Sequence, residues 1–339
     1  MMKLPDVRDF NLDQKTVLLR IDTDLPFGDG QVKDDTRLVE SLPTINHLLA
    51  KGARIIILGH LGRPKGKFTS GLSLKPIASR LEKLVGKEIP LMEDFSKTAS
   101  LLNMLENLRF WSGEEENDLG FAKKLASLGD FYVNDSFATC HRQHASIVGL
   151  PKLLPHAAGL DLLEEMKVLS SVREEPKRPV VVVIGGVKKD KLDCLPGFLD
   201  WADLVLIGGK LVVYPEAKEA KSPKKKLADL GKTGEDITLE STIEFVEKIR
   251  QAGTIIWSGP LGKVEDGQFQ ASTRIFAEAV VSSKAFRIVG GGDTEAALTR
   301  FGLEGKMDFV SSGGGAMLEY LAYGDLPGLK ALKEKETDD

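Results

Sequence analysis

The sequence of 339 residues contains only two cysteines, Cys140 and Cys194. Two residues so far apart form neither a metal-binding spacing nor a disulfide framework. We expect both to be small buried hydrophobic residues, and we expect a reducing compartment, the cytoplasm. No apolar run approaches the roughly 18 residues of a membrane-spanning helix, and the first ten residues lack the apolar segment of a signal peptide. We therefore expect no membrane partner.

An excess of positive charge is also missing. The chain has 46 Lys and Arg against 50 Asp and Glu, a net charge of −4, and neither its first 159 residues nor the remainder is strongly basic. This balance argues against a nucleic-acid partner, so any anion site must be built locally. The GxGxxG fingerprint and the GxxxxGK[ST] loop are absent as well, which argues against a nicotinamide dehydrogenase and a P-loop enzyme.

The length suits two domains, and one well-bounded helix lies near the middle of the chain. Leu163, Met166, Leu169 and Val172 recur at helical spacing, and Pro176 ends the pattern. We predict an interdomain helix at 160–176 between domains at 1–159 and 177–325; a plain connection without a coupling role is the alternative. A tail at 326–339 becomes charged from Pro327, and we expect it to fray.

Short apolar runs alternate with amphipathic segments on both sides of this helix, which predicts an α/β fold with parallel sheets covered on both faces. The predicted strands are 16–21, 54–58, 103–108, 131–134, 180–184, 204–207, 254–257, 286–289 and 308–310. The predicted helices are 35–51, 74–85, 117–128, 194–201, 240–251 and 272–281. Residues 210–236 are the least regular part, and we interpret 222–226 as a solvated loop.

In the first half, basic side chains follow predicted strands. They are His60, Arg63, Arg109 and Arg142. Each alone is most simply a surface ion pair. Several at the carboxyl ends of one sheet favour an anion site, because open α/β sheets bind ligands there and Arg contacts carboxylate or phosphate in a bidentate way. His47 and His144 lack such support, and we interpret both as structural.

In the second half, glycine runs follow predicted strands and precede helices. Residues 290–294, GGGDT, combine glycines that allow close backbone approach with a helix N-terminus that offers free amides to phosphates. Asp293 is a candidate ligand for a magnesium ion that bridges phosphates, or alternatively a helix N-cap. Residues 312–316, SGGGA, repeat the arrangement.

A third glycine pair, Gly185 and Gly186, precedes three lysines: Lys188, Lys189 and Lys191. Positive charge at a helix start opposes the helix dipole, so a solvated helix start is the less favoured interpretation. Neutralisation of phosphates explains these lysines better.

Taken in order, RIDTDLP, DDTRLVESLPTI, GHLGRPKGK, LENLRF, YVNDSFATCHRQHAS, WSGPLGKVE, GGGDT and SSGGGAMLE resemble the phosphoglycerate kinase family almost end to end. The resemblance implies two doubly wound parallel-sheet domains, joined by a central helix, that close like a hinge, with the C-terminal tail returning toward it. It also implies reversible phosphoryl transfer between 1,3-bisphosphoglycerate and ADP, giving 3-phosphoglycerate and ATP, in glycolysis and gluconeogenesis, with Mg²⁺. The first domain would bind phosphoglycerate and the second the nucleotide, and we expect a monomer.

The same resemblance assigns roles to particular residues. The positions that match its phosphoglycerate-binding residues are Asp22, Asp24, Arg37, His60, Arg63, Arg109 and Arg142. Those that match its nucleotide-binding residues are Lys188, Lys191, Gly208, Glu265, Gly291, Gly292, Asp293 and Thr294, with Asp293 as the metal ligand. Arg37, Lys188, Gly314 and Gly315 match the residues at the point of transfer.

Four features depart from the family pattern. Asp24 and Ser258 each stand where the family has Asn. The lysine motif is one residue shorter, so Lys189 competes with Lys191 for one position. The segment 209–237, which normally builds much of the adenine pocket, is dozens of residues shorter, which leaves base preference open. A non-catalytic phosphoglycerate-binding member of the family is therefore the alternative to a working kinase, although such a binder would not need Lys188, Glu265 or Asp293.

Overall fold

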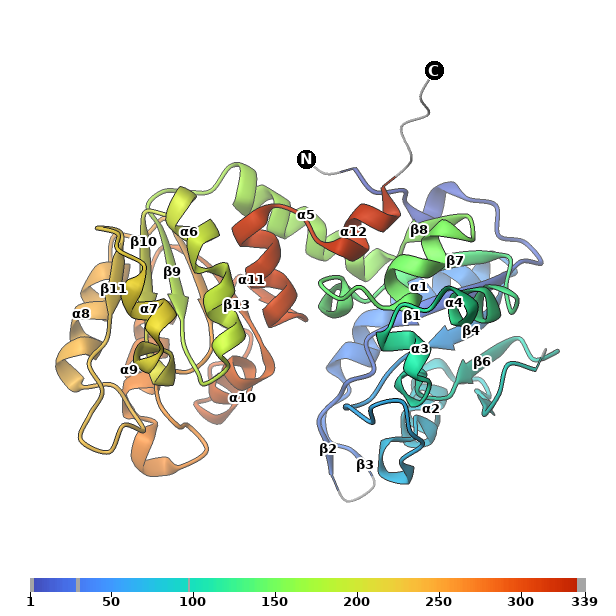
Figure 1. Cartoon of the computed structure of the whole chain (residues 1–339), viewed down its shortest axis with the longest axis horizontal. Helices are drawn as coiled ribbons and strands as arrows, with labels where there is room; N and C mark the ends of the chain where they lie inside the picture. Colours follow the sequence, from blue (N-terminus) through green and yellow to red (C-terminus); the bar gives the residue numbers. More distant parts are fainter. Residues whose placement is uncertain (1–2, 29–30, 97, 334–339) are drawn as a thin grey trace. The chain divides into compact units, whose positions relative to one another are not determined.

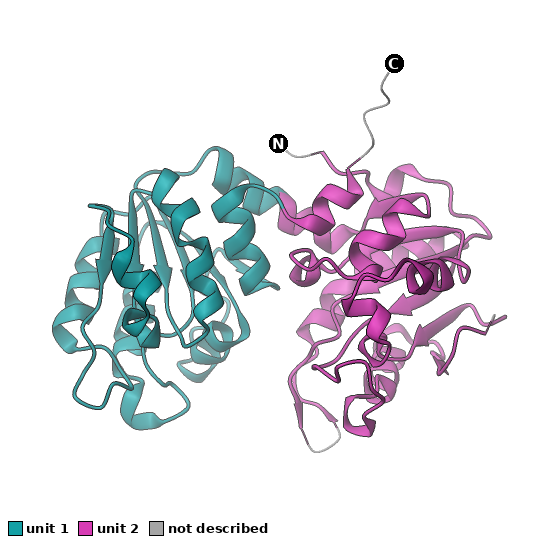
Figure 2. Ribbon diagram, in the orientation of Figure 1, with its two compact units in different colours: residues 1, 167–325 teal, residues 2–166, 326–339 magenta. Residues whose placement is uncertain are grey.

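The protein divides into two compact units (Figure 2). The computed structural model describes residues 3–28, 31–96 and 98–333. We call residues 2–166 with 326–339, magenta and unit 2 in Figure 2, the first unit, because they come first in the sequence, and residues 167–325, teal and unit 1 in Figure 2, the second unit. The boundary lies within α5 (Leu160–Glu174), the helix predicted near the middle of the chain. Each unit is described here by itself.

A parallel sheet forms the centre of the first unit, with strand order β5-β6-β4-β1-β7-β8. Its strands are β1 (Thr16–Ile21), β4 (Arg54–Leu58), β5 (Leu91–Met92), β6 (Leu102–Leu105), β7 (Phe131–Asp135) and β8 (His156–Ala158). Neighbouring strands pair in parallel, and β1 lies between β4 and β7. The chain winds outward from β1 in both directions, so the carboxyl ends of β1, β4 and β7 lie at the topological switch point where such sheets bind ligands.

Helices cover both faces of this sheet (Figure 1). They are α1 (Thr36–Ala50), α2 (Lys75–Val85), α3 (Ser112–Glu115), α4 (Leu119–Ala126) and the C-terminal α12 (Pro327–Leu332). Alternate residues of β1, such as Val17 and Leu19, pack with Leu38 and Ile45 of α1 in one apolar core. Leu18, on the opposite face of the strand, is also buried. Both faces of β1 are therefore covered, which explains its almost continuous apolar sequence.

The second unit repeats the architecture with strand order β11-β10-β9-β12-β13-β14, again in parallel. Its strands are β9 (Val180–Ile184), β10 (Leu204–Ile207), β11 (Lys225–Leu227), β12 (Thr254–Ser258), β13 (Phe286–Gly290) and β14 (Phe309–Ser311). Its helices are α6 (Leu195–Trp201), α7 (Pro215–Glu219), α8 (Leu239–Ile249), α9 (Ala271–Ser282), α10 (Gly292–Arg300) and α11 (Gly314–Tyr323). The predicted doubly wound parallel sheets are confirmed.

Two predicted elements of the first unit have the wrong bounds. The strand predicted at 103–108 is β6, and Arg109 instead lies in a 3₁₀ helix, Leu108–Phe110. Asn107 caps this turn, because its side-chain oxygen accepts from the Arg109 amide at 3.1 Å. The helix predicted at 117–128 is α4, which begins after Asp118 caps it, since the left-handed φ of 53° at Asn117 separates it from α3.

The prediction that the tail frays from Pro327 is wrong as far as residue 333. Leu326, Leu329 and Leu332 are fully buried, a spacing that forms one apolar helix stripe within the charged surroundings. The Gly328 amide donates to the Cys140 carbonyl oxygen at 2.8 Å, which places α12 on the first unit. Residues 334–339 lie outside the described residues.

The interpretation of 222–226 as a solvated loop is wrong for its last two residues. Lys225 and Lys226 belong to β11, which pairs with β10 at the edge of the second sheet. Lys226 forms an ion pair with Glu244 at 2.5 Å. A short lysine-rich strand at a sheet edge discourages pairing with other chains, which gives these lysines a structural explanation.

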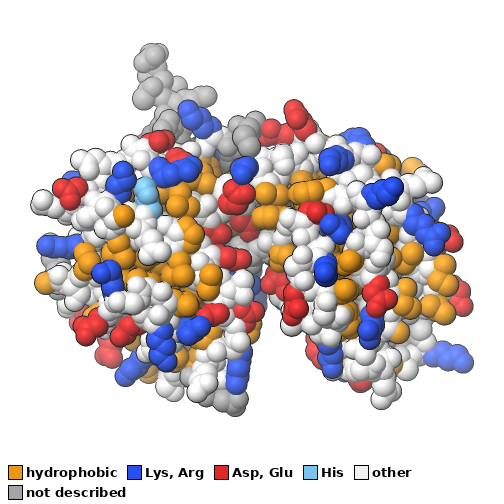
Figure 3. All heavy atoms as spheres, turned by 180° about the vertical axis from the view of Figure 1, so that it is seen from behind, with side chains coloured by type: hydrophobic (Ala, Val, Ile, Leu, Met, Phe, Trp, Pro, Cys, Tyr) orange, Lys and Arg blue, Asp and Glu red, His pale blue; other side chains and the backbone are white. Residues whose placement is uncertain are grey.

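The surfaces of both units carry interspersed acidic and basic side chains on the face that Figure 3 shows. This agrees with the small net charge of the sequence. Within the described ranges, no helix is long and apolar enough to cross a membrane. Both cysteines are buried free thiols, as predicted.

Candidate active site

The first unit gathers basic side chains at the carboxyl ends of its central strands. Burial lowers the pKa of the His60 imidazole well below its usual value, and the charges of Arg20, Arg109 and Arg37 lower it further. These arginines come from separate parts of the sequence and lie near one imidazole. The sequence predicted this gathering for Arg37 and Arg109 but did not predict it for Arg20.

Arg37 is held by the turn that follows β1. Its Nη1 donates to Asp22 Oδ2 at 2.8 Å and to the Asp24 carbonyl oxygen at 3.0 Å. The Asp24 carboxylate accepts from the Gly62 amide at 2.9 Å. Because Asp24 binds the loop after β4 in this way, it ties together the two loops that carry Asp22 and His60.

Burial divides the predicted phosphoglycerate-binding residues into two groups. The side chains of Asp22, His60 and Arg109 are buried, whereas those of Arg63 and Arg142 are exposed. Arg109 Nη1 donates to the Gly62 carbonyl oxygen at 2.8 Å, and its Nε lies 3.6 Å from Glu115 Oε1. The fold thus holds an inner set of groups in fixed positions. Arg63 follows the same strand as His60, and Arg142 follows β7, but their side chains remain at the surface.

The interpretation of His144 as structural did not predict that it lies close to the arginines of the candidate site. Its Nδ1 lies 3.9 Å from the buried Glu114 Oε1. Burial, followed by the charges of Arg109, Arg20 and Arg142, lowers the pKa of His144 to about 3. His144 therefore lies among the basic side chains of the first unit but is itself a neutral ring. The HRQH spacing in the sequence was the available signal, because it places His144 two residues after Arg142.

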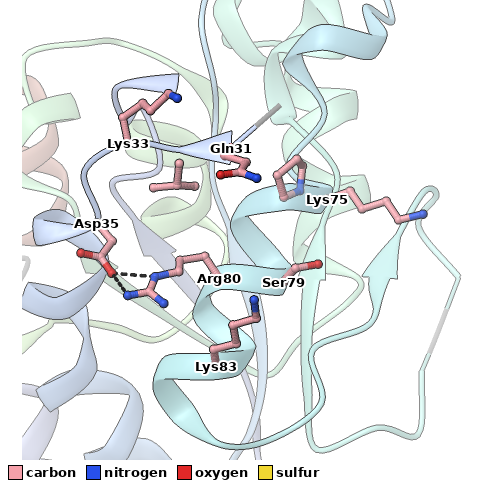
Figure 4. A pocket seen from close by; sticks show the side chains of 9 residues that line it. Gln31, Lys33, Asp35, Lys75, Ser79, Arg80 and Lys83 are labelled. Carbon is pink, nitrogen blue, oxygen red and sulfur yellow. Dashed lines mark hydrogen bonds and ion pairs between the residues drawn. The ribbon is translucent and has the colours of Figure 1, made fainter. Parts of the chain in front are cut away.

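A hollow of the first unit lies between the β2–β3 hairpin (Phe27–Gly28 and Gln31–Val32) and α2, with a volume of about 690 Å³. Lysines line it, but Arg80 Nε donates to Asp35 at 2.7 Å and is neutralised there. The charged ends of Lys33 and Lys75 point away from Arg80 (Figure 4). These cations do not converge, so we do not assign the hollow a ligand.

In the second unit, a cavity of about 350 Å³ opens at the carboxyl ends of the strands. Of the predicted nucleotide site, Glu265 and Asp293 line it. The other lining residues are Gly186, Val187, Gly209, Lys210, Glu235, Pro260, Gly262 and Lys263. Of these the sequence singled out Gly186, as one of the glycine pair before the three lysines. Lys210 and Glu235, paired at 2.8 Å, both come from the shortened segment 209–237. That segment therefore still contributes charged groups to the cavity wall.

Glycine loops pack backbone against backbone beside this cavity. A Cβ added to Gly314 would lie 2.5 Å from Gly291 Cα, and one added to Gly209 would lie 2.7 Å from the Gly186 amide nitrogen. Gly291 itself has a φ of 102°, which side-chain-bearing residues rarely adopt. The glycines of these loops are needed for close approach. The result is a set of backbone amides at the starts of α10 and α11, suited to anions.

The three lysines after β9 take different positions. Lys191 Nζ donates to the Gly185 carbonyl oxygen at 3.2 Å, and burial lowers the pKa of Lys191 to about 8. Lys189 instead pairs with Glu216 at 2.6 Å. Lys188 Nζ lies 3.9 Å from Asp293 Oδ2, with both side chains more than half exposed. The geometry thus favours Lys191 over Lys189 for the second lysine position.

Thr294 and Gly208 lie behind the cavity wall. The Gly259 amide donates to Thr294 Oγ1 at 2.7 Å, so this buried hydroxyl joins the loops after β12 and β13. A Cβ on Gly208 would meet Leu261 at 2.6 Å. Ser258 Oγ is buried and, among the residues that the structure describes, has no hydrogen-bond partner.

Asp293 is a fitting ligand for magnesium. Over the described parts of the chain, no three His, Cys, Asp or Glu side chains come together as a protein-only metal site. Mg²⁺ commonly binds through one or two carboxylates, with phosphate oxygens and waters completing its shell. The exposed Asp293 carboxylate beside the glycine loops is a side chain of that kind.

Comparison with known proteins identifies the family. The sequence model described as phosphoglycerate kinase matches residues 7–221 and 212–323. The chain belongs to the phosphoglycerate kinase family. A phosphoglycerate kinase of Pseudothermotoga lettingae is 37% identical, with 99% of this chain and 100% of that protein covered, and one of Fervidobacterium nodosum is 38% identical, with 97% and 98% covered.

Solved structures of phosphoglycerate kinases agree with the fold. The enzyme of Coxiella burnetii superposes with a TM-score of 0.80 at 34% identity, covering 97% of this chain and 99% of that one. The enzyme of Pyrococcus horikoshii superposes with a TM-score of 0.83 at 28% identity, covering 97% and 98%. The family resemblance of the motifs is thus confirmed over nearly the whole chain.

The comparisons also bear on the shortened segment. The alignment with the Pseudothermotoga phosphoglycerate kinase runs over 397 residues, against 339 in this chain, so that relative contains residues without counterparts here. The two matched ranges of the phosphoglycerate kinase model meet at residues 212–221, inside the segment 209–237. Lys210 and Glu235 lie on either side of this overlap in the sequence, and both line the cavity of the second unit.

Proposed function

We propose that the chain is a working phosphoglycerate kinase, which transfers a phosphoryl group reversibly between 1,3-bisphosphoglycerate and ADP and yields 3-phosphoglycerate and ATP. In the forward direction a terminal oxygen of ADP forms the new bond to phosphorus, and the carboxylate of 3-phosphoglycerate leaves. The observation that carries the proposal is that the chain matches one family over almost its entire length, in both units. The reaction would belong to glycolysis and gluconeogenesis.

Phosphoglycerate would bind to the first unit. The buried His60 and Arg109 and the Asp22-bound Arg37 form a fixed set of groups for an anion, and the exposed Arg63 and Arg142 would add charge from the surface. Because each guanidinium is an obligate donor, the set favours a substrate with several anionic oxygens.

The nucleotide would bind in the cavity of the second unit. Lys188 and Lys191 would neutralise phosphates, and the amides at Gly291 and Gly292 would contact them. Asp293 would hold a magnesium ion, which supplies positive charge to the phosphate oxygens. The groups that contact the transferring phosphoryl group would be Lys188, Arg37 and the amides near Gly314 and Gly315, which would neutralise its charge and position it.

The non-catalytic alternative is less well supported. A protein that only binds phosphoglycerate would need neither the Lys191 contact at Gly185 nor the exposed Asp293 and Lys188 beside the glycine loops. The shortened segment, however, still leads us to expect weak nucleotide binding and loose base choice.

Turnover of the Lys188→Ala variant tests the proposal. At saturating phosphoglycerate, with ATP, GTP and other nucleotides in turn, we expect it to be roughly a hundredfold slower than wild type, on the scale of one lost electrostatic donor. Lys189→Ala is the matched control, because Lys189 is tied to Glu216 and should retain wild-type turnover. Equal background rates for wild type and Lys188→Ala would establish the non-catalytic alternative.

A further inference from the structure

A fully buried arginine lies behind the predicted phosphoglycerate site. Arg20 is on β1 and is 1% exposed. Its Nη2 lies 2.8 Å from His60 Nδ1, its Nε donates to Ser146 Oγ at 3.3 Å, and its Nη1 donates to the Ile21 carbonyl oxygen. A buried cation at a strand position otherwise suited to apolar residues requires an explanation.

The contact with His60 determines where the ring carries its proton. A guanidinium has only donors, so a hydrogen bond from Arg20 requires an unprotonated Nδ1 on His60. A neutral imidazole carries one N–H, and it must then be at Nε2. Among the described residues that nitrogen has no hydrogen-bond partner, and the carboxylate oxygen Asp24 Oδ2 lies 3.8 Å from it.

The surroundings also keep the ring neutral and fixed. Burial and the positive charges of Arg20, Arg109 and Arg37 oppose protonation of the ring, while the Asp24 carboxylate is half exposed at 3.8 Å. His144 is a further titratable neighbour, and its pKa of about 3 leaves it neutral at neutral pH. The His60 amide donates to Thr23 Oγ1 at 2.7 Å, and that hydroxyl donates back to the His60 carbonyl oxygen at 2.7 Å, so the backbone is clamped.

We propose that Arg20 is a positioning residue that holds His60 as its neutral Nε2–H tautomer, so that His60 presents one fixed N–H donor to an anionic oxygen of the substrate. The identity of that substrate rests on the proposed function, whereas the tautomer does not. A neutral donor of fixed direction adds orientation to a site whose other groups supply charge.

The charge of Arg20 is balanced from the opposite side. Ser146 Oγ donates to Glu114 Oε1 at 2.5 Å, and the Ser146 amide donates to Glu114 Oε2 at 2.9 Å. Glu114 is 1% exposed. Burial raises the pKa of Glu114, but the charge of Arg20 opposes this rise. The chain Glu114–Ser146–Arg20–His60 thus connects a buried carboxylate to the ring, and it fixes the guanidinium that determines the tautomer.

Nitrogen-15 NMR of histidine-labelled wild-type protein tests the tautomer without any substrate. The chain has five histidines, so the His60 signals can be assigned from the spectrum of His60→Gln. We expect an unprotonated Nδ1 and a protonated Nε2, unchanged from about pH 5.5 to 8, whereas a free histidine titrates near 6.5. An imidazolium or an Nδ1–H signal at neutral pH would overturn the proposal.

Two variants then separate the hydrogen bond from the charge. Arg20→Met removes both, so the ring should populate both tautomers and its pKa should rise. Arg109→Met removes a neighbouring positive charge that does not bond the ring, so the pKa should rise while the Nε2–H tautomer persists. An unchanged tautomer in folded Arg20→Met would show that Arg20 has no role in it. If Arg20→Met does not fold, the wild-type spectrum still decides whether the tautomer exists.

Binding of 3-phosphoglycerate, measured by calorimetry, tests the consequence. His60→Gln keeps an N–H donor at the distance of Nε2, whereas His60→Asn places its amide at the distance of Nδ1. We expect His60→Gln to bind close to wild type and His60→Asn to bind about tenfold to a hundredfold more weakly, as for one lost hydrogen bond to a charged group. Equal losses in both variants would overturn the donor role. If wild type bound no 3-phosphoglycerate, the proposed function would fail while the NMR result stood.

Discussion

Gly314→Ala tests the close packing of the glycine loops in the second unit. The added methyl group would lie 2.5 Å from Gly291 Cα, 2.6 Å from its amide nitrogen and 2.9 Å from the Gly290 carbonyl carbon. All three are backbone atoms, so no side chain can rotate away and relieve the overlap. The loop after β13 or the start of α11 must move instead.

The expected loss of stability follows from that geometry. Overpacking of a tight interior costs about 1 to 3 kcal/mol, and contact with backbone alone favours the upper end. Replacing Gly by Ala in the first turn of α11 recovers somewhat less than about 1 kcal/mol. We therefore expect Gly314→Ala to lower the free energy of unfolding of the second unit by about 2 kcal/mol.

Urea unfolding followed by tryptophan fluorescence measures this change, because the buried Trp257 lies on β12 of the same unit. Gly292→Ala is the matched control for stability. A Cβ there meets nothing within 4 Å, and the residue begins α10, so this variant should be as stable as wild type or slightly more stable. If Gly314→Ala unfolded at the same urea concentration as Gly292→Ala, the close approach of the two loops would be refuted.

Three further predictions concern the sites and the pH dependence of stability. Arg37→Ala should weaken 3-phosphoglycerate binding by about 2 to 3 kcal/mol in calorimetry, whereas Asp24→Asn should bind as well as wild type or better, because it removes a negative charge and keeps an acceptor for the Gly62 amide. A clear loss for Asp24→Asn would contradict this. ADP affinity should fall as the pH rises through about 8, where the buried Lys191 loses its proton. The Lys191→Met variant should bind ADP weakly at every pH. A wild-type affinity for ADP that stays constant to pH 9 would refute the role of Lys191 in neutralising phosphates. Burial and the neighbouring Asp135 raise the pKa of Asp161 to about 9, so the folded state binds a proton that the unfolded chain releases near pH 4; its stabilising effect is complete below pH 4 and is lost as the pH rises toward 9. In urea unfolding, Asp161→Asn should therefore match wild type at pH 4 and exceed it at pH 8, and equal stabilities at both pH values would count against the shifted pKa.

Local sequence patterns predicted most of the regular structure. The run Val180–Ile184 is β9 residue for residue, and the helix recognised from Leu163 to Val172 is part of α5. Such patterns suffice because burial on both faces makes a strand continuously apolar and burial of one stripe gives a helix its period, and both signals can be recognised within a few residues. The positions after strands were predictable for the same reason, since parallel strands deliver their carboxyl ends to one edge of a sheet.

The partners of individual side chains were decided only by the tertiary structure. Arg20 reads as one charge in an apolar strand, and its contacts, His60 and Ser146, lie 40 and 126 residues away. Lys210 and Glu235 meet only because the chain between them turns back beside the cavity. Periodicity describes which face a residue occupies and carries no information on what lies opposite. The sequence by itself therefore determined the sheets, the loops that carry the candidate sites and, through its motifs, the family. Only the tertiary structure determined which charged side chains contact each other.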